Sequence, residues 1–243
     1  MIMFCLTADI SAESKLKTEA EVSAYVDSIT SFDNIKDITR SFKRVDVTDD
    51  NTPFLYKQIN GKKDIWVQEI KNVRLKLKST APAFKDKYNR TFKIFIDPNG
   101  GMLLKIMSKF EGYDPNLLPE PNAISAQKQL FNSTGELYLG FPKEPPKISF
   151  LDALNVCIGS PMTAKEIDAI YVLWKSNVSP EPRKVWIITL RGISMPSSGG
   201  PPWIRSKDNN IITRMRTVVD ADTGKAIIAS TIPIPEVPDK TKK

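Results

Sequence analysis

Acid–base chemistry in this chain would have to rest on carboxylates, because none of its 243 residues is histidine. The absence of histidine excludes Ser-His-Asp and Cys-His nucleophile systems and the H-E-x-x-H zinc site. The 28 Asp and Glu residues could still supply the acid and base of a hydrolase, but no spacing singles out such a pair. We therefore predict no catalytic residue and no cofactor. A histidine-free hydrolase that uses paired carboxylates is an alternative.

Two segments combine an aspartate with a glycine four residues later. They read IDPNGG and VDADTG, and they place Asp97 with Gly101 and Asp220 with Gly224, 123 residues apart. The D-x-D-x-G pattern resembles the start of a calcium loop, but the third carboxylate and the distal glutamate are missing. We predict structural turns, in which the aspartate accepts backbone N–H groups and the glycine adopts positive φ. No metal site is predicted.

Basic side chains are concentrated in one part of the chain. Residues 51–110 carry 13 basic and 4 acidic side chains, whereas the whole chain has a formal net charge of +7. The basic residues of this stretch form a candidate patch for an anionic ligand, made of Lys71, Arg74, Lys76, Lys78, Lys85, Lys87, Arg90 and Lys93.

The segment NVRLKLKS, residues 72–79, alternates basic and apolar side chains. We expect a strand with one exposed face and one face packed beneath a helix, namely Arg74, Lys76 and Lys78 against Val73, Leu75 and Leu77. The basic face is either a solvated surface that discourages edge-to-edge pairing or a patch for membrane lipid, wall polymer or nucleic acid. We favour the solvated surface. Nucleic acid is not expected, because no aromatic residues interleave the basic ones.

The elements around the two turns repeat in the same order. Each turn is preceded by a strand that contains a tryptophan, DIWVQEIKNVRL with Trp66 and KVWIITLRGISM with Trp186, 120 residues apart. Each strand is preceded by a helix start, TEAE at residues 18–21 and SFLD at residues 149–152. Segment 163–175 fits either a helix or a strand. The repetition predicts two copies of one α+β unit.

These features together resemble the PepSY family. A capped helix, an aromatic-bearing strand and an apolar strand that ends in VVDADTG look like a PepSY or PepSY-like module, most closely at residues 149–230. The resemblance implies a helix packed on an antiparallel sheet. Such modules occur in bacterial extracytoplasmic proteins and in propeptides of secreted metalloproteases, where they bind or inhibit. The family has no catalytic residues to transfer to this chain.

The predicted fold is therefore α+β, with two tandem PepSY/cystatin-like repeats. The first repeat spans residues 17–110 and the second spans residues 148–232. The proline-rich segment 111–147 links them and includes a possible short hairpin, residues 1–16 are a signal-peptide remnant or a flexible N-terminus, and residues 233–243 form an extended tail.

The predicted function is a non-catalytic binding module. The ligand would be a protein or peptide, and the protein would be secreted or periplasmic and would act in the cell envelope either as a binding module or as a protease inhibitor. The alternative ligand is an anionic polymer that binds the basic strand 71–93. No apolar stretch approaches the roughly 20 residues of a membrane-spanning helix.

Overall fold

The computed structural model describes eight stretches of the chain, which are residues 16–32, 37–46, 64–75, 89–98, 102–110, 135–157, 163–196 and 210–233. Two helices lie in them, α1 (Glu19–Thr30) and α4 (Phe150–Asn155). The strands in the same stretches are β1 (Thr39–Val45), β2 (Ile65–Val73), β3 (Arg90–Asp97), β4 (Met102–Phe110), β5 (Leu137–Gly140), β6 (Glu166–Ser176), β7 (Ser179–Pro196), β8 (Asn210–Asp220) and β9 (Ala226–Pro233).

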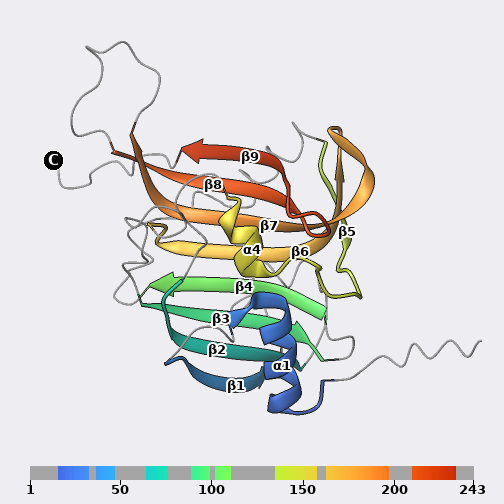
Figure 1. Cartoon of the computed structure of the whole chain (residues 1–243), viewed down its shortest axis with the longest axis vertical. Helices are drawn as coiled ribbons and strands as arrows, with labels where there is room; N and C mark the ends of the chain where they lie inside the picture. The colour runs from blue at the N-terminus through green and yellow to red at the C-terminus, as the bar shows by residue number, and fades with distance from the viewer. Residues whose placement is uncertain are drawn as a thin grey trace, which may run out of the picture.

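The described strands form one nine-stranded antiparallel sheet (Figure 1). The strand order is β1-β2-β3-β4-β6-β7-β8-β9, and β5 pairs with β6 beyond the end of β4. The prediction of a mixed α and β protein with antiparallel strands is confirmed. Strands β4 and β6 are separated by residues 111–165 in the sequence but are neighbours in the sheet. They pair from Ile106↔Ala169 to Lys109↔Glu166.

Both helices begin at the predicted caps. The Thr18 hydroxyl accepts the Glu21 N–H at 3.2 Å, and the Glu21 carboxylate accepts the Thr18 N–H at 2.9 Å. These bonds satisfy N–H groups that the first helical turn leaves without partners. At the second helix the Ser149 hydroxyl accepts the Asp152 N–H at 3.1 Å. Helix α1 has 12 residues and α4 has 6. In the described part of the chain, no helix is long and apolar enough to cross a bilayer.

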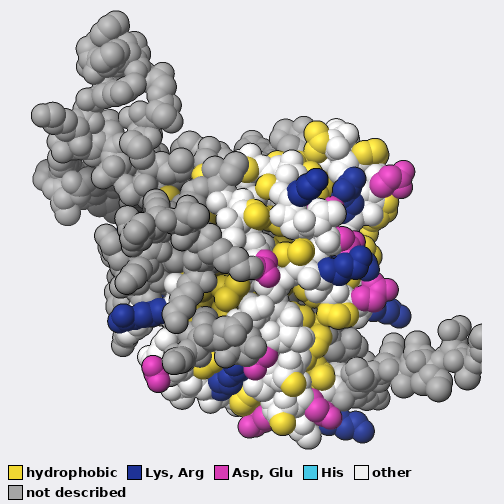
Figure 2. Space-filling view, in the orientation of Figure 1, with side chains coloured by type: hydrophobic (Ala, Val, Ile, Leu, Met, Phe, Trp, Pro, Cys, Tyr) yellow, Lys and Arg dark blue, Asp and Glu magenta, His cyan; other side chains and the backbone are white. Residues whose placement is uncertain are grey.

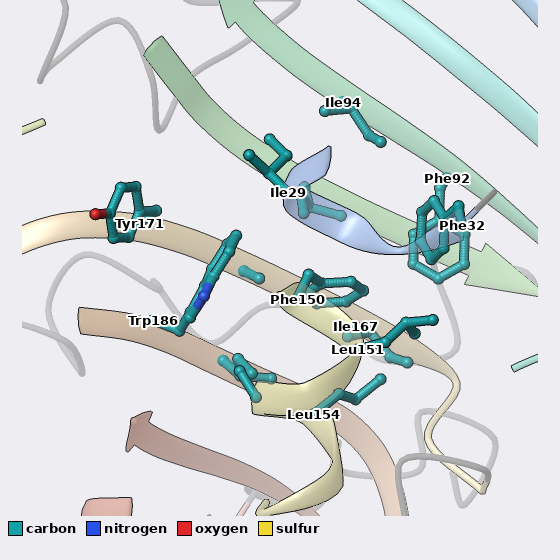
Figure 3. Close-up of a cluster of buried hydrophobic side chains, with 14 of the residues drawn as sticks. Ile29, Phe32, Phe92, Ile94, Phe150, Leu151, Leu154, Ile167, Tyr171 and Trp186 are labelled. Carbon is teal, nitrogen blue, oxygen red and sulfur yellow. The ribbon is translucent and has the colours of Figure 1, made fainter. Parts of the chain in front are cut away.

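The two helices lie on the same face of the sheet, here called the helix face (Figure 1). Between them and the strands lies one apolar core, whose centre is an aromatic group (Figure 3). Phe150 of α4 has its ring centroid 5.9 Å from Phe32, which follows α1, and 6.0 Å from both Phe92 and Trp186. Side chains from both halves of the chain therefore share one core.

The opposite face of the sheet, here called the strand face, has a second apolar cluster over β6, β7 and β8. Ile170, Trp174 and Ile187 belong to it, and Tyr138 and Phe141 pack against it. These two aromatic side chains come from residues 135–141, here called the strap, which includes β5. The strap therefore covers part of the strand face of the second half.

On the helix face, the described charged side chains of the two signs are interspersed (Figure 2). Figure 2 shows this face, on which basic and acidic side chains lie next to one another among apolar ones. The ion pairs of the described residues include Arg40 with Asp27, at 2.6 Å, and Lys184 with Glu144. Surface pairs of this kind contribute little to stability.

Three local expectations are resolved by the structure. Segment 163–175 is largely strand β6, and its apolar residues do not alternate because the helix-side core and the strap cover both of its faces. The predicted strand through residues 72–79 is wrong at Arg74 and Leu75, because β2 ends at Val73 after Asn72 adopts φ +62°, and residues 76–79 lie outside the described residues. Of the predicted short hairpin, β5 is described and pairs with β6, and the arm before Gly135 lies outside the described residues.

Candidate functional site on the strand face

One row of residues crosses the strand face from edge to edge, and it is here called the polar row. It takes one residue from each of eight strands through successive cross-strand pairs, which are Ser41, Glu69, Lys93, Met107, Asp168, Thr189, Arg216 and Ser230. Neighbouring residues such as Ile94, Ala169 and Ile188 lie in the helix-side core. Since side chains alternate along a strand, the side chains that the seven strands other than β4 contribute to the row belong to the opposite face.

In the second half, two carboxylates converge on one guanidinium beside the polar row. Arg191 of β7 lies 3.3 Å from Glu166 and 3.3 Å from Asp168, both on β6. All three side chains are at most 17% exposed. The strand pairs Glu166↔Arg191 and Asp168↔Thr189 bring them together, because alternate residues of β6 share one face.

The strap supplies a third carboxylate to this half. Glu136 accepts hydrogen bonds from both terminal nitrogens of Arg216, with Nη1–Oε1 at 3.0 Å, and from the indole nitrogen of Trp174 at 3.1 Å. Arg216 also donates to the Tyr138 hydroxyl at 3.1 Å. The Glu136 side chain is fully buried and that of Arg216 is 7% exposed. Such a bidentate pair orients both partners and compensates for their burial.

Burial and hydrogen bonding act in opposite directions on the pKa values of this group. It raises the pKa of Tyr138 far above its usual range, although the positive charge of Arg216 acts in the opposite direction. Burial by itself would lower the pKa of Arg216, but the hydrogen bond to Glu136 raises it above its ordinary value. Tyr138 is therefore a neutral hydroxyl, and Arg216 keeps its charge at all physiological pH values.

In the first half, one carboxylate serves two lysines. Glu69 lies 3.1 Å from the Lys71 ammonium and 3.7 Å from the Lys93 ammonium. The Lys71 and Lys93 side chains are 55% and 49% exposed. This part of the polar row is thus open to solvent and carries an excess of positive charge.

The predicted basic patch is divided by the structure. Lys71 and Lys93 lie on the strand face around Glu69, whereas Arg90 is fully buried and cannot belong to an exposed patch. Arg74 is exposed and donates to Asn89 at 2.7 Å. Val73 and Leu75 lie in the core that contains α1. The other predicted residues, Leu77, Lys76, Lys78, Lys85 and Lys87, lie outside the described residues.

The second predicted turn is held by its aspartate. Asp220 Oδ1 accepts the N–H groups of Asp222 at 3.0 Å and Thr223 at 2.9 Å, and Gly224 has φ +71°. Burial would raise the pKa of Asp220, but these N–H groups and the Arg183 guanidinium hold it below its ordinary value. Asp97 is 2% exposed, and Gly101 lies outside the described residues. Within the described stretches, no cluster of three or more His, Cys, Asp or Glu residues could hold a metal ion.

This arrangement is suited to recognition more than to proton transfer. A hydrolytic carboxylate dyad needs one protonated and one ionised group, each with access to a substrate. Glu166 and Asp168 are instead both paired with Arg191, and they are largely buried from a substrate. The exposed charges around Glu69 can exchange their present partners for those of a ligand.

Sequence reasoning missed most of the charged residues of the second half. Glu136 and Arg216 are 80 residues apart, and no local pattern connects them. A signal for Arg191 existed, because the tryptophan alignment pairs it with Lys71. Glu166 and Asp168 could have been predicted to share one face only if residues 163–175 had been predicted as a strand.

Comparisons with known proteins give no relative for this chain. It matches no protein-family model, and neither curated proteins nor solved structures provide a match. Its function must therefore be inferred from the geometry of its own residues.

Proposed function

We propose that the chain consists of two tandem copies of one PepSY-like module and that it acts by binding a protein or peptide. The copies are residues 17–110 and 148–232. Each contains a capped helix followed by four antiparallel strands, α1 with β1 to β4 and α4 with β6 to β9. Corresponding strands run in the same direction, so that the second copy continues the sheet of the first.

Matching hydrogen bonds support the duplication. The Trp66 indole donates to the Leu16 carbonyl at 3.0 Å, and the Trp186 indole donates to the Ile148 carbonyl at 2.8 Å. The backbone N–H of Leu16 donates to Pro98, and that of Ile148 donates to Ala221, both at 3.0 Å. Each accepting residue directly follows the aspartate of its turn. In both copies, the chain before the helix is therefore hydrogen-bonded to the tryptophan of the strand and to the residue that follows the turn aspartate.

The irregularities of the strands support it too. The β2–β3 register shifts at Asn72, which has φ +62°, and the β7–β8 register shifts at Gly192, which has φ +69°, 120 residues later. The register of the β3–β4 pair shifts at Phe95/Ile96, and that of the β8–β9 pair shifts at Val218/Val219, 123 residues later. Bulges are specific local structures, so their recurrence at the spacing of the repeat favours a common origin.

Binding is the activity that the charge pairing favours. The single observation that carries this proposal is that Glu166 and Asp168, the adjacent carboxylates of the strand face, are both paired with Arg191. The exposed part of the polar row, around Glu69, presents solvent-exposed charged side chains to a partner. We further propose a secreted or periplasmic location, on the basis of the apolar residues 1–6 and the PepSY resemblance.

The test is cross-linked capture of partners from a native cell envelope. The baits are the wild type, the double variant Lys71→Glu/Lys93→Glu and the control Lys225→Glu, which changes an exposed lysine of the second turn. We expect the wild type and the control to retain one partner in stoichiometric amount and the double variant to lose it. The proposal is overturned if no bait retains a partner, or if the wild type hydrolyses a substrate and Glu166→Gln abolishes the reaction.

A further inference from the structure

The two halves of the strand face carry matching cations. When Trp66 is aligned with Trp186 and Asp97 with Asp220, Lys71 corresponds to Arg191 and Lys93 to Arg216. The strand registers agree, since Glu69 pairs with Lys93 and Thr189 pairs with Arg216. Each half therefore places two cations around one position of the polar row.

The carboxylates do not match. In the second half, Arg191 is paired with the carboxylates of Glu166 and Asp168. Arg216 is paired with the carboxylate of Glu136. By strand register, the positions of Glu166 and Asp168 correspond in the first half to Thr39, which pairs with Lys71, and Ser41, which pairs with Glu69. Both of these residues are exposed and neither is ionisable. Among the described residues, the two lysines of the first half thus share one carboxylate, that of Glu69.

We propose that the first half of the strand face docks an extended acidic segment of a partner protein, whose carboxylate binds Lys93 as Glu136 binds Arg216. This inference rests on the proposed function and specifies the chemistry of its ligand. The partner segment would supply carboxylates at the positions where the described first half has Thr39 and Ser41 in place of Glu166 and Asp168. The exposed Lys71 and Lys93 ammonium groups can reorient toward it, because long lysine side chains adopt many rotamers.

The strap shows how such a segment is held. Its carboxylate, that of Glu136, reaches the guanidinium of Arg216, while Tyr138 packs on apolar residues of the same face. A peptide is favoured over an anionic polymer because the contact to be reproduced is a single carboxylate beside an aromatic residue. An acidic lipid surface or a nucleic acid would instead require a broad field of cations.

The experiment uses the strap sequence itself as the probe. A capped heptapeptide GELYLGF, which reproduces residues 135–141, is titrated into the full chain by calorimetry or fluorescence anisotropy. We expect saturable binding that weakens about tenfold when the glutamate of the peptide is replaced by glutamine, because one charge-assisted hydrogen bond is lost. Lys93→Arg should tighten binding severalfold, since a guanidinium can bind the carboxylate with two hydrogen bonds.

Two variants make the result decisive. Lys93→Glu should abolish binding, and the matched control Lys225→Glu should leave it unchanged. The inference is overturned if the peptide does not bind, if Lys93→Glu binds it as well as the wild type does, or if anionic vesicles or DNA bind through Lys93 and the peptide does not. Capture of a partner through a non-acidic segment would overturn this inference and leave the proposed binding function standing.

Discussion

Gln68 is a polar side chain in an apolar position. It is fully buried on the helix face of β2, opposite Phe42 and Ile94, and neither atom of its amide has a hydrogen-bond partner. The corresponding residue 120 positions later is Ile188, which is also fully buried. A buried amide without partners costs free energy, so this position reduces the stability of the first half.

Replacing this amide by an apolar side chain should stabilise the protein. We expect Gln68→Ile to raise the free energy of unfolding by about 1 kcal/mol or more, and the converse change Ile188→Gln to lower it by about 2 kcal/mol or more. Urea denaturation of both variants measures the difference. A destabilising Gln68→Ile would show that the amide has a bonding partner in solution.

The Asp220 turn should make stability depend on pH in the acid range. Its pKa is lowered in the folded state, so its contribution is present above the unfolded pKa of about 4 and is lost as the pH falls through the folded value. We expect Asp220→Asn to cost about 1–2 kcal/mol at pH 7 and progressively less below pH 4. Urea unfolding at several pH values measures this convergence.

Asp222→Asn is the matched control in the same turn. Asp222 is 43% exposed and pairs only at the surface with Lys147, at 3.2 Å. We expect a loss of less than about 1 kcal/mol at every pH. Equal losses for Asp220→Asn at pH 7 and pH 3 would contradict the role of the charged carboxylate.

At the scale of elements, each of the strands β2 and β7 contains one residue in a left-handed conformation. Asn72 and Gly192 occupy these positions, and both residue types tolerate positive φ better than others do. The two sites differ in their surroundings. Asn72 is exposed, whereas a Cβ atom at Gly192 would lie 2.8 Å from the Lys165 side chain.

Alanine should therefore be tolerated less well at the second bulge. We expect Asn72→Ala to lower the free energy of unfolding by about 1 kcal/mol, which is the cost of the left-handed conformation. Gly192→Ala should lower it by about 2–3 kcal/mol, because the Lys165 side chain must also move. Chemical denaturation of the two variants compares them, and equal losses would contradict the steric explanation.

At the scale of the whole molecule, the two halves are joined by backbone and side chains. The β4–β6 pairing makes the sheet continuous, and Phe150 of the second half packs against Phe32 and Phe92 of the first. An interface of this kind resembles the interior of a single domain. The halves should therefore unfold together.

We expect one unfolding transition in which far-ultraviolet circular dichroism and tryptophan fluorescence coincide. Phe150→Ala should lower the free energy of unfolding by about 3–5 kcal/mol, because it leaves a cavity where the halves meet. Two separate transitions in the wild type would show that the halves are independent. A loss below about 1 kcal/mol would show that the aromatic group does not couple them.

Local patterns in the sequence were enough for several elements. The capping residues located the starts of both helices, the matching tryptophan segments around Trp66 and Trp186 located β2 and β7, and VVDADTG located the β8–β9 turn. These features depend on residues within a few positions of one another. The antiparallel α and β class of the fold follows from them.

The tertiary structure alone decided how these elements meet. Pairing of β4 with β6, the strap over β6 and the contact between Glu136 and Arg216 join residues separated by long connections. The register of such pairs depends on burial of both sheet faces at once, which no window of the sequence contains. For the same reason, Arg90 is basic and lies in a basic stretch, yet it is buried, while Lys93, three residues later, faces solvent.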